Sequence, residues 1–210
     1  MKIFLLTILF LLSPRYSFSQ DQEETKLQEK KKSAFNLLFG GAAGNFAIDG
    51  ANFNSIYSNR SISRIYIAGI GGDQLMLIGK YREFYAHGVS KLQNIEVAGK
   101  ADWKQKFYSV GLRLMSDDSP LYADLLYVVT RMEETITTNN PVVKELTTTE
   151  MLENKGGGVA LGVTINILGP IKIFVEGDYS IMISKDSNKQ GKKIPELGGA
   201  CGSAGVVIIL

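Results

Sequence analysis

Apolar and polar residues alternate with a period of two through much of the chain after residue 33. In the segment 157–168 the odd positions hold large aliphatic side chains and the even positions hold small or polar ones. Successive side chains of a strand point to opposite faces, so this period predicts β structure. We expect eight strands, at about 34–45, 62–70, 74–85, 104–115, 120–133, 157–168, 171–183 and 198–210.

The connections between these strands alternate in length. Three are tight turns built from glycine, proline, aspartate and serine, at 71–73, 116–119 and 169–170. The others are long and polar, at about 46–61, 86–103, 134–156 and 184–197. Alternate connections of an antiparallel up-and-down sheet lie at opposite ends, so the short turns fall at one end and the long ones at the other. This asymmetry is typical of transmembrane β-barrels.

The two faces of the strands differ in a way that favours a membrane. The apolar faces carry large, often β-branched side chains, whereas the opposite faces are rich in Gly, Ala, Ser and Thr. Such small residues would cover a water-exposed surface poorly, but they fit a narrow lumen. We therefore predict an all-β fold, an eight-stranded antiparallel up-and-down transmembrane β-barrel whose apolar faces meet lipid. The segments 62–70 and 198–210 are apolar on both faces, and their orientation stays open.

In its strand count, loop asymmetry, face pattern and C-terminal strand, the chain resembles the small OmpA/OmpX-type outer-membrane barrels over residues 34–210. The resemblance is architectural and includes no catalytic motif. It implies the outer membrane of a double-membrane bacterium as the location. It also implies a structural role, or a role in adhesion or binding through four long external loops.

The N-terminal residues predict export. Lys2 is followed by an apolar core over 3–12, and Ser17 and Ser19 suit cleavage before Gln20. Ten apolar residues rise about 15 Å as a helix, too little for a hydrocarbon core of about 30 Å. We interpret residues 1–19 as a signal peptide, residues 20–33 as a charged tether and residues 34–210 as the barrel.

Composition narrows the possible functions. The chain has 23 basic and 21 acidic residues, and two of the basic ones, Lys2 and Arg15, lie in or beside the apolar leader, so the remainder is balanced in charge. Nucleic-acid binding needs a clear basic excess and is not expected. A single Cys and a single His disfavour disulfides, most catalytic triads and multi-residue metal sites. We predict no cofactor, no metal site and no catalytic residues.

The strand parity places several charged side chains in the lumen. These residues are Lys80, Arg82, Arg113, Asp124, Lys172, Glu176 and Asp178. Unpaired charges would be costly there, so we expect them to pair, with Arg113 and Asp124 as neighbours beside one turn. We interpret the set as a structural polar plug. A selective path for small solutes is the alternative, although eight strands leave too little room for a porin-like channel.

Two other functions remain open. His87, with Ser90 three residues on, could centre a lipid-modifying enzyme, but the spacing is not a recognised nucleophile motif, and we interpret His87 as an ordinary loop histidine. A soluble, exported, lipocalin-like barrel that binds an apolar ligand is the other alternative. It would turn inward the side chains of Ile171, Ile173, Val175, Ile181 and Ile183.

The long connections are the expected functional surface. The third carries threonines at 135, 137, 138, 147, 148 and 149. The fourth carries possible contacts to lipid phosphates at Lys185, Lys189, Lys192 and Lys193. Trp103, Tyr81 and Tyr85 are expected in the aromatic girdle. The expected partners are outer-membrane lipid and a surface ligand or envelope protein, and the barrel is expected to be a monomer.

Overall fold

The computed structural model describes residues 35–48, 51–57, 59–91, 98–116, 119–137, 147–183 and 198–210. The predicted signal peptide (1–19) and tether (20–33) lie outside these ranges. So do the four lysines at 185, 189, 192 and 193.

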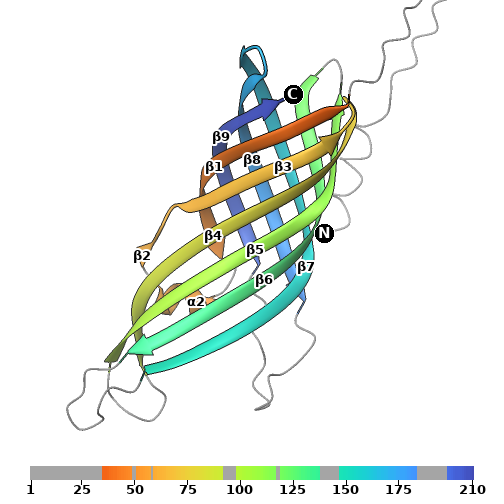
Figure 1. Ribbon diagram of the computed structural model, residues 1–210. Coiled ribbons are helices and arrows are strands. Elements are labelled where there is room, and N and C mark those ends of the chain that lie inside the picture. Colours follow the sequence, from red (N-terminus) through yellow and green to blue (C-terminus); the bar gives the residue numbers. More distant parts are fainter. Residues whose placement is uncertain are drawn as a thin grey trace, which may run out of the picture. The chain divides into compact units, whose positions relative to one another are not determined.

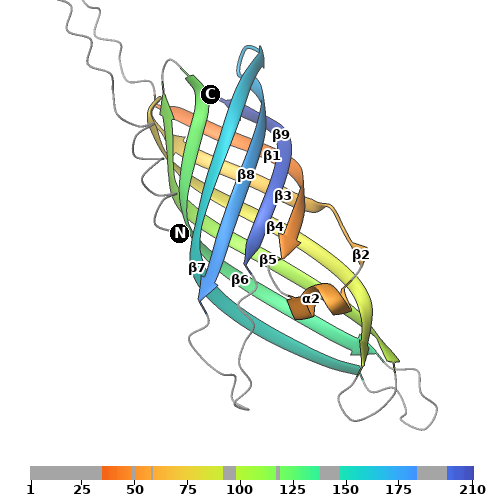
Figure 2. The same cartoon turned by 180° about the vertical axis from the view of Figure 1, so that it is seen from behind.

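Eight long antiparallel strands close into a barrel (Figures 1 and 2). They are β1 (Asn36–Ile48), β3 (Ser63–Gly71), β4 (Leu75–Lys91), β5 (Ala98–Ser116), β6 (Ser119–Thr137), β7 (Thr147–Leu168), β8 (Ile171–Ile183) and β9 (Gly199–Ile209). A short helix, α2 (Ala51–Ile56), and a two-residue strand, β2 (Asn59–Arg60), lie between β1 and β3. Each long strand pairs with the next along the chain, as an up-and-down topology requires.

Pairing of the first strand with the last closes the barrel. The β1–β9 ladder runs from Leu38 opposite Ile209 to Ile48 opposite Gly199. Leu37 and Leu210 then exchange two backbone hydrogen bonds of 2.9 Å at the short-turn rim. Closure leaves no unpaired strand edge along the barrel wall. Lipid could not form hydrogen bonds with the backbone groups of such an edge.

The predicted orientation of the faces is confirmed. The outer face exposes large apolar side chains from every wall of the barrel, including Phe39, Leu77, Leu112, Leu125, Leu161, Val175, Ile181 and Ile208. Ile171, Ile173, Val175, Ile181 and Ile183 are all exposed, so the lipocalin-like alternative, which needs them inside, is wrong. An apolar outer surface of this extent needs lipid around it.

The structure also orients the two strands that the sequence left open. Ile65 and Ile67 of β3 are buried in the lumen, whereas Tyr66 and Ile70 face outward. In β9, Val207 is buried and its neighbours Val206 and Ile208 are exposed.

Strands β4 to β7 are longer than predicted, and the connections between them are shorter. The second long connection, expected at 86–103, narrows to 92–97, and the third, expected at 134–156, narrows to 138–146. Five of the six threonines therefore belong to β6 or β7. Beyond the membrane both faces of a strand can be polar, so the apolar alternation stops while the backbone ladder continues, as threonine's β propensity favours.

Within the described ranges, no helix has both the length and the apolar character needed to cross a membrane.

The outward assignment predicts a depth-dependent cost for charge. Leu161→Arg, halfway along the exposed apolar rows of β7 and β8, should destabilise the barrel in phospholipid vesicles by about 2–4 kcal/mol, because arginine replaces a lipid-facing leucine. Urea titration followed by the fluorescence of Trp103, the single tryptophan, measures this. Val89→Arg, near the outer end of β4, is the control and should cost about 0–1 kcal/mol. Equal costs for the two variants would contradict the assignment.

Candidate functional site

The middle of the lumen holds a network of buried charges from four strands. Lys80 of β4 lies between Asp124 of β6 and Glu176 of β8, with its Nζ 2.6 Å from a carboxylate oxygen of each. Arg113 of β5 donates two hydrogen bonds to Asp124, at 2.7 and 2.9 Å, and one to Glu176 at 3.3 Å. The two acidic groups thus share two bases, and all four side chains are buried.

Tyr122 completes this network. Its hydroxyl donates to Glu176 at 2.9 Å, and the Arg113 guanidinium lies 3.8 Å from the centre of its ring. Gly162 makes room for the ring, because a Cβ at that position would come within 2.2 Å of Tyr122. The glycine of β7 therefore serves packing in the lumen rather than a turn.

A second buried pair lies next to the first network. Arg82 of β4 pairs with Asp178 of β8, and its guanidinium lies 5.4 Å from the ring centres of both Phe46 and Phe107. With this pair the lumen network contains three bases and three acids and is neutral. Burial of charge is costly, and pairing together with hydrogen bonding offsets that cost.

Lys172 differs from the other six predicted lumen residues. It lies on the lumen side of β8 but is only half-buried, and it forms no ion pair with another residue in the part of the chain that the structure describes. Its place near the short-turn rim separates it from the buried network.

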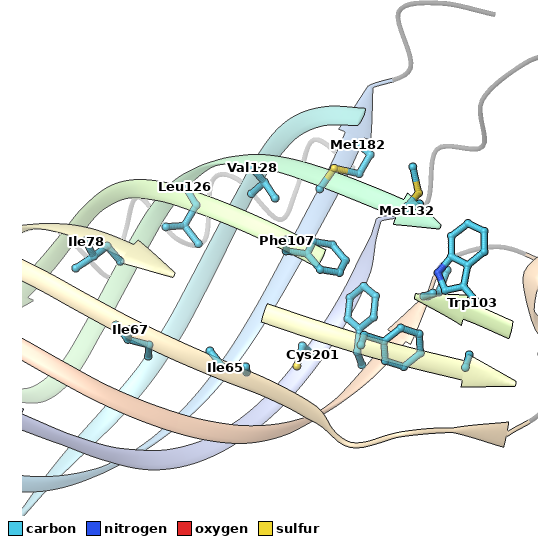
Figure 3. Close-up of a cluster of buried hydrophobic side chains, with 14 of the residues drawn as sticks. Ile65, Ile67, Ile78, Trp103, Phe107, Leu126, Val128, Met132, Met182 and Cys201 are labelled. Carbon is cyan, nitrogen blue, oxygen red and sulfur yellow. The ribbon is translucent and has the colours of Figure 1, made fainter. Parts of the chain in front are cut away.

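Aromatic side chains fill the lumen toward the long-loop end. Phe46 contacts Phe84 and Phe107, with ring centres 5.4 and 5.0 Å apart. Figure 3 shows Phe107, Met132 and Met182 reaching into the barrel, with Trp103 beyond them toward the outer mouth. Trp103 is 4% exposed, so its predicted place in the lipid-facing girdle is wrong. It follows the odd-numbered, inward parity of β5.

Figure 2 shows the helix α2 at the end of the barrel to which the long strands β5 and β6 extend. Phe53 and Tyr57, which follows the helix, lie with ring centres 5.3 and 5.7 Å from that of Trp103. The Tyr57 hydroxyl donates to the Glu134 carboxylate. Burial and this carboxylate raise the pKa of Tyr57. This helix and its aromatic contacts were not predicted, although the four-residue spacing of Phe53 and Tyr57 was a signal for one apolar helix face.

Buried side chains from every long strand line the lumen. A cavity of about 20 Å³ lies beside Arg82 and Asp178, which is room for about one water molecule. Together with the neutral ion network and the aromatic layer, this packing favours a structural plug over a path for solutes.

His87 acquires an acidic partner that the sequence had not placed. Its Nδ1 lies 2.6 Å from Asp102 across the β4–β5 ladder, and Lys100 lies 3.2 Å from the other oxygen of Asp102. The hydrogen bond with His87 holds the pKa of Asp102 below its usual range. The His87 side chain is 52% exposed, however, so water reaches the pair and it lacks the strengthening of electrostatic interactions that an enclosed active site gives.

The remaining chemistry is sparse. Cys201 is buried in the lumen. Among the described residues, no group of three or more His, Cys, Asp or Glu side chains could hold a metal ion.

The lumen network generates a stability prediction. Arg113→Met should destabilise the barrel by about 3–5 kcal/mol, because Asp124 and Glu176 would then share Lys80 alone. Urea unfolding followed by Trp103 fluorescence measures this. The double variant Arg113→Met/Asp124→Leu leaves the Lys80–Glu176 pair balanced and should recover more than half of the loss. A single variant that unfolds like the wild type would refute the role of this network.

The His87–Asp102 pair generates a titration prediction. His87→Ala should raise the pKa of Asp102 toward its ordinary value, because a hydrogen bond to the carboxylate is lost. A carboxylate with a lowered pKa stabilises the fold above its ordinary pKa, and this contribution disappears as the pH falls through the lowered value. Carbon NMR of Asp102 in micelles follows the titration. Lys100→Gln is the control, with a smaller upward shift, and an unchanged pKa in His87→Ala would contradict the assignment.

Comparisons with known proteins bear on the fold. No protein-family model and no curated protein sequence matches the chain. Neisserial surface protein A is 14% identical, with a TM-score of 0.51 over 83% of this chain and 96% of that one. Ail, the attachment invasion locus protein of Yersinia pestis, is 10% identical, with a TM-score of 0.50 over 84% and 97%. A major outer membrane protein from Thermus thermophilus is 8% identical, with a TM-score of 0.53 over 84% and 100%.

These likenesses show that the fold is that of small outer-membrane β-barrels. The apolar outer face independently requires lipid around the barrel. Fold and surface together place the chain in an outer membrane.

Proposed function

We propose that this protein is a surface-interaction protein whose barrel anchors a rigid binding platform outside the membrane. The observation that carries the proposal is the extension of β4, β5, β6 and β7 beyond the lipid-facing surface. The ladders continue without interruption to Lys91 opposite Ala98 and to Thr137 opposite Thr147. β8, by contrast, ends opposite Lys155 of β7.

The dimensions of the platform suit contact with a macromolecule. On β4, nine residues from Glu83 to Lys91 lie beyond the outward-facing Tyr81. At about 3.3 Å per residue they span roughly 30 Å along the strand. Exposed polar and charged side chains on the platform offer hydrogen-bonding groups to a partner. Examples are His87 of β4, Lys100 of β5 and Arg131 of β6.

Contacts from the first connection support the platform. Phe53 and Tyr57 pack on Trp103 of β5, and β2 pairs with β4 at Asn59–His87 and Arg60–Ala86. A supported sheet loses less conformational entropy on binding than four free loops would. This favours recognition by the sheet itself, rather than only by the four long loops that the sequence suggested.

The other candidate roles have less support. The filled lumen disfavours transport, and the exposure of His87 disfavours a lipid-modifying enzyme centred on it. The barrel is expected to act as a monomer, since its strands close without a partner chain. Ail, which shares the fold, is named for attachment and was solved with the heparin analogue sucrose octasulfate, so a barrel of this class can carry a binding surface. We propose a binding role of this kind for the present chain.

Removal of the platform tests the proposal. Residues 84–105 and 131–153 are each replaced by Asn-Gly, which keeps the pairs Glu83–Lys106 and Thr130–Asn154 in register. The truncated barrel should still show a heat-dependent gel shift, but cells that display it should lose at least about tenfold in binding to a panel of immobilised glycans and matrix proteins.

The control changes the opposite rim. Asp117-Asp118, between β5 and β6, is replaced by Asn-Gly, and this variant should bind like the wild type. Wild-type cells that bind nothing in the panel, or truncated cells that bind as well as the wild type, would leave envelope structure as the better description.

A further inference from the structure

We propose that Gly88 is the residue that positions the binding platform. Because it has no side chain, the first connection can dock on the lumen side of the platform, where it braces the outer ends of β4, β5 and β6. We call the described part of this connection, residues 51–57 and 59–61, the brace. The inference rests on the proposed function in one respect, which is that the braced strands form the binding surface.

The backbone of the brace approaches β4 very closely at Gly88. A Cβ at this position would overlap the carbonyl oxygen of Ile56, and it would lie 2.7 Å from the Ile56 carbonyl carbon and 3.0 Å from the Tyr57 Cα. These are backbone atoms, which cannot turn aside as the end of a flexible side chain can. Gly88 has no positive φ, so the close approach, and not the backbone conformation, is what requires glycine here.

The surface around this contact consists of small residues. Ala86 and Gly88 lie on the lumen face of β4, and Ala101 of β5 is the ladder partner of Gly88. Ala86 and Ala101 are both fully buried. Larger side chains at these positions would hold the brace away from the sheet, so two neighbouring strands are matched to it.

The brace contacts three strands of the platform. Its short strand β2 pairs with β4. The rings of Phe53 and Tyr57 lie with their centres 5.3 and 5.7 Å from that of Trp103 of β5. The Tyr57 hydroxyl donates to the Glu134 carboxylate of β6. One short segment therefore connects the outer ends of β4, β5 and β6.

The brace also takes the place of β3 beside the outer part of β4. The β3–β4 ladder ends at Arg64 opposite Glu83, whereas β4 continues to Lys91. Beyond Glu83, Ser61 donates its backbone N–H to the Tyr85 carbonyl at 2.9 Å, and β2 pairs next. A strand edge without such a cover opens more readily. Docking of the brace at Gly88 therefore determines how firmly the outer part of β4 is held.

Hydrogen exchange and Trp103 fluorescence of the full chain in micelles test the proposal with Gly88→Ala. The added methyl group should undock the brace, so the backbone amides of residues 84–91 and 100–105 should exchange at least about tenfold faster than in the wild type. Trp103, which is 4% exposed in the docked arrangement, should become accessible to acrylamide. Wild-type exchange and a shielded Trp103 in Gly88→Ala would overturn the proposal.

Gly79→Ala is the matched control on the same strand. A Cβ at Gly79 meets only the Ser109 carbonyl oxygen, at 3.9 Å, so this variant should behave like the wild type in both measurements. Faster exchange of the same amides in Gly79→Ala would overturn the assignment to Gly88.

A linker variant shows whether Gly88 acts through the brace. Residues 51–57 are replaced by the same number of glycines and serines, which removes the helix and leaves β4 to β7 unchanged. The amides of β4 and β5 should again exchange faster, and addition of Gly88→Ala should change nothing further, because both changes remove one contact. Wild-type exchange in the linker variant, or a further acceleration on adding Gly88→Ala, would overturn the proposal. The linker variant decides the question even where Gly88→Ala gives no heat-dependent gel shift.

Binding by displaying cells separates this inference from the proposed function. Gly88→Ala should lower binding to the panel of glycans and matrix proteins at least about tenfold while the barrel stays folded. Wild-type cells that bind nothing would overturn the proposed function, and the exchange rates would still decide the role of Gly88. A Gly88→Ala variant with fast exchange and wild-type binding would overturn this inference and leave the proposed function standing.

Discussion

Every feature of this protein depends on one constraint: in lipid, each backbone N–H and C=O must find its partner within the barrel. The β1–β9 ladder meets that constraint by closing the sheet. Closure with eight strands leaves a lumen so narrow that side chains fill it. The outer face must then be apolar, and the inner face is filled by apolar side chains together with charges that neutralise one another. The sequence pattern and the lumen network are both consequences of this single requirement.

The lumen shows how charge can be kept inside such a narrow barrel. Lys80 and Arg113 bridge Asp124 and Glu176, while Arg82 and Asp178 form a separate pair between aromatic rings. Interactions of this kind add little net stability compared with a well-packed apolar core, but removal of one partner is costly. The network therefore acts mainly as a set of conditions on register, because a slip of one residue in any contributing strand would send a charge toward lipid.

The period of two was enough to predict the lipid-facing sides of β7 and β8 and the neighbouring positions of Arg113 and Asp124. The period of two failed to predict strands outside the membrane, because lipid on one face is what imposes that period. Beyond the membrane no face of a strand needs to be apolar, so the outer ends of β4 to β7 were predicted as loops. Trp103 was misplaced because tryptophan suits both an interface and a core, and only its parity on the longer β5 decides between them. The contacts of Lys80 with Asp124 and Glu176 across the lumen were not predicted, because they depend on how the strands are staggered around the barrel and no local sequence pattern indicates that stagger.

The unequal strand lengths make the external end of the molecule lopsided. In Figure 1 the strands β4 to β7 extend farthest toward the bottom of the picture and form a wall on one side, while β8, β9, β1 and β3 end higher in the picture. A large partner arriving from outside therefore encounters the protein from a preferred direction, and rotation of the barrel about its own axis within the bilayer changes what the cell surface presents. Any contact with a lipid or a neighbouring protein that prevented this rotation would also fix the direction in which the wall formed by β4 to β7 faces.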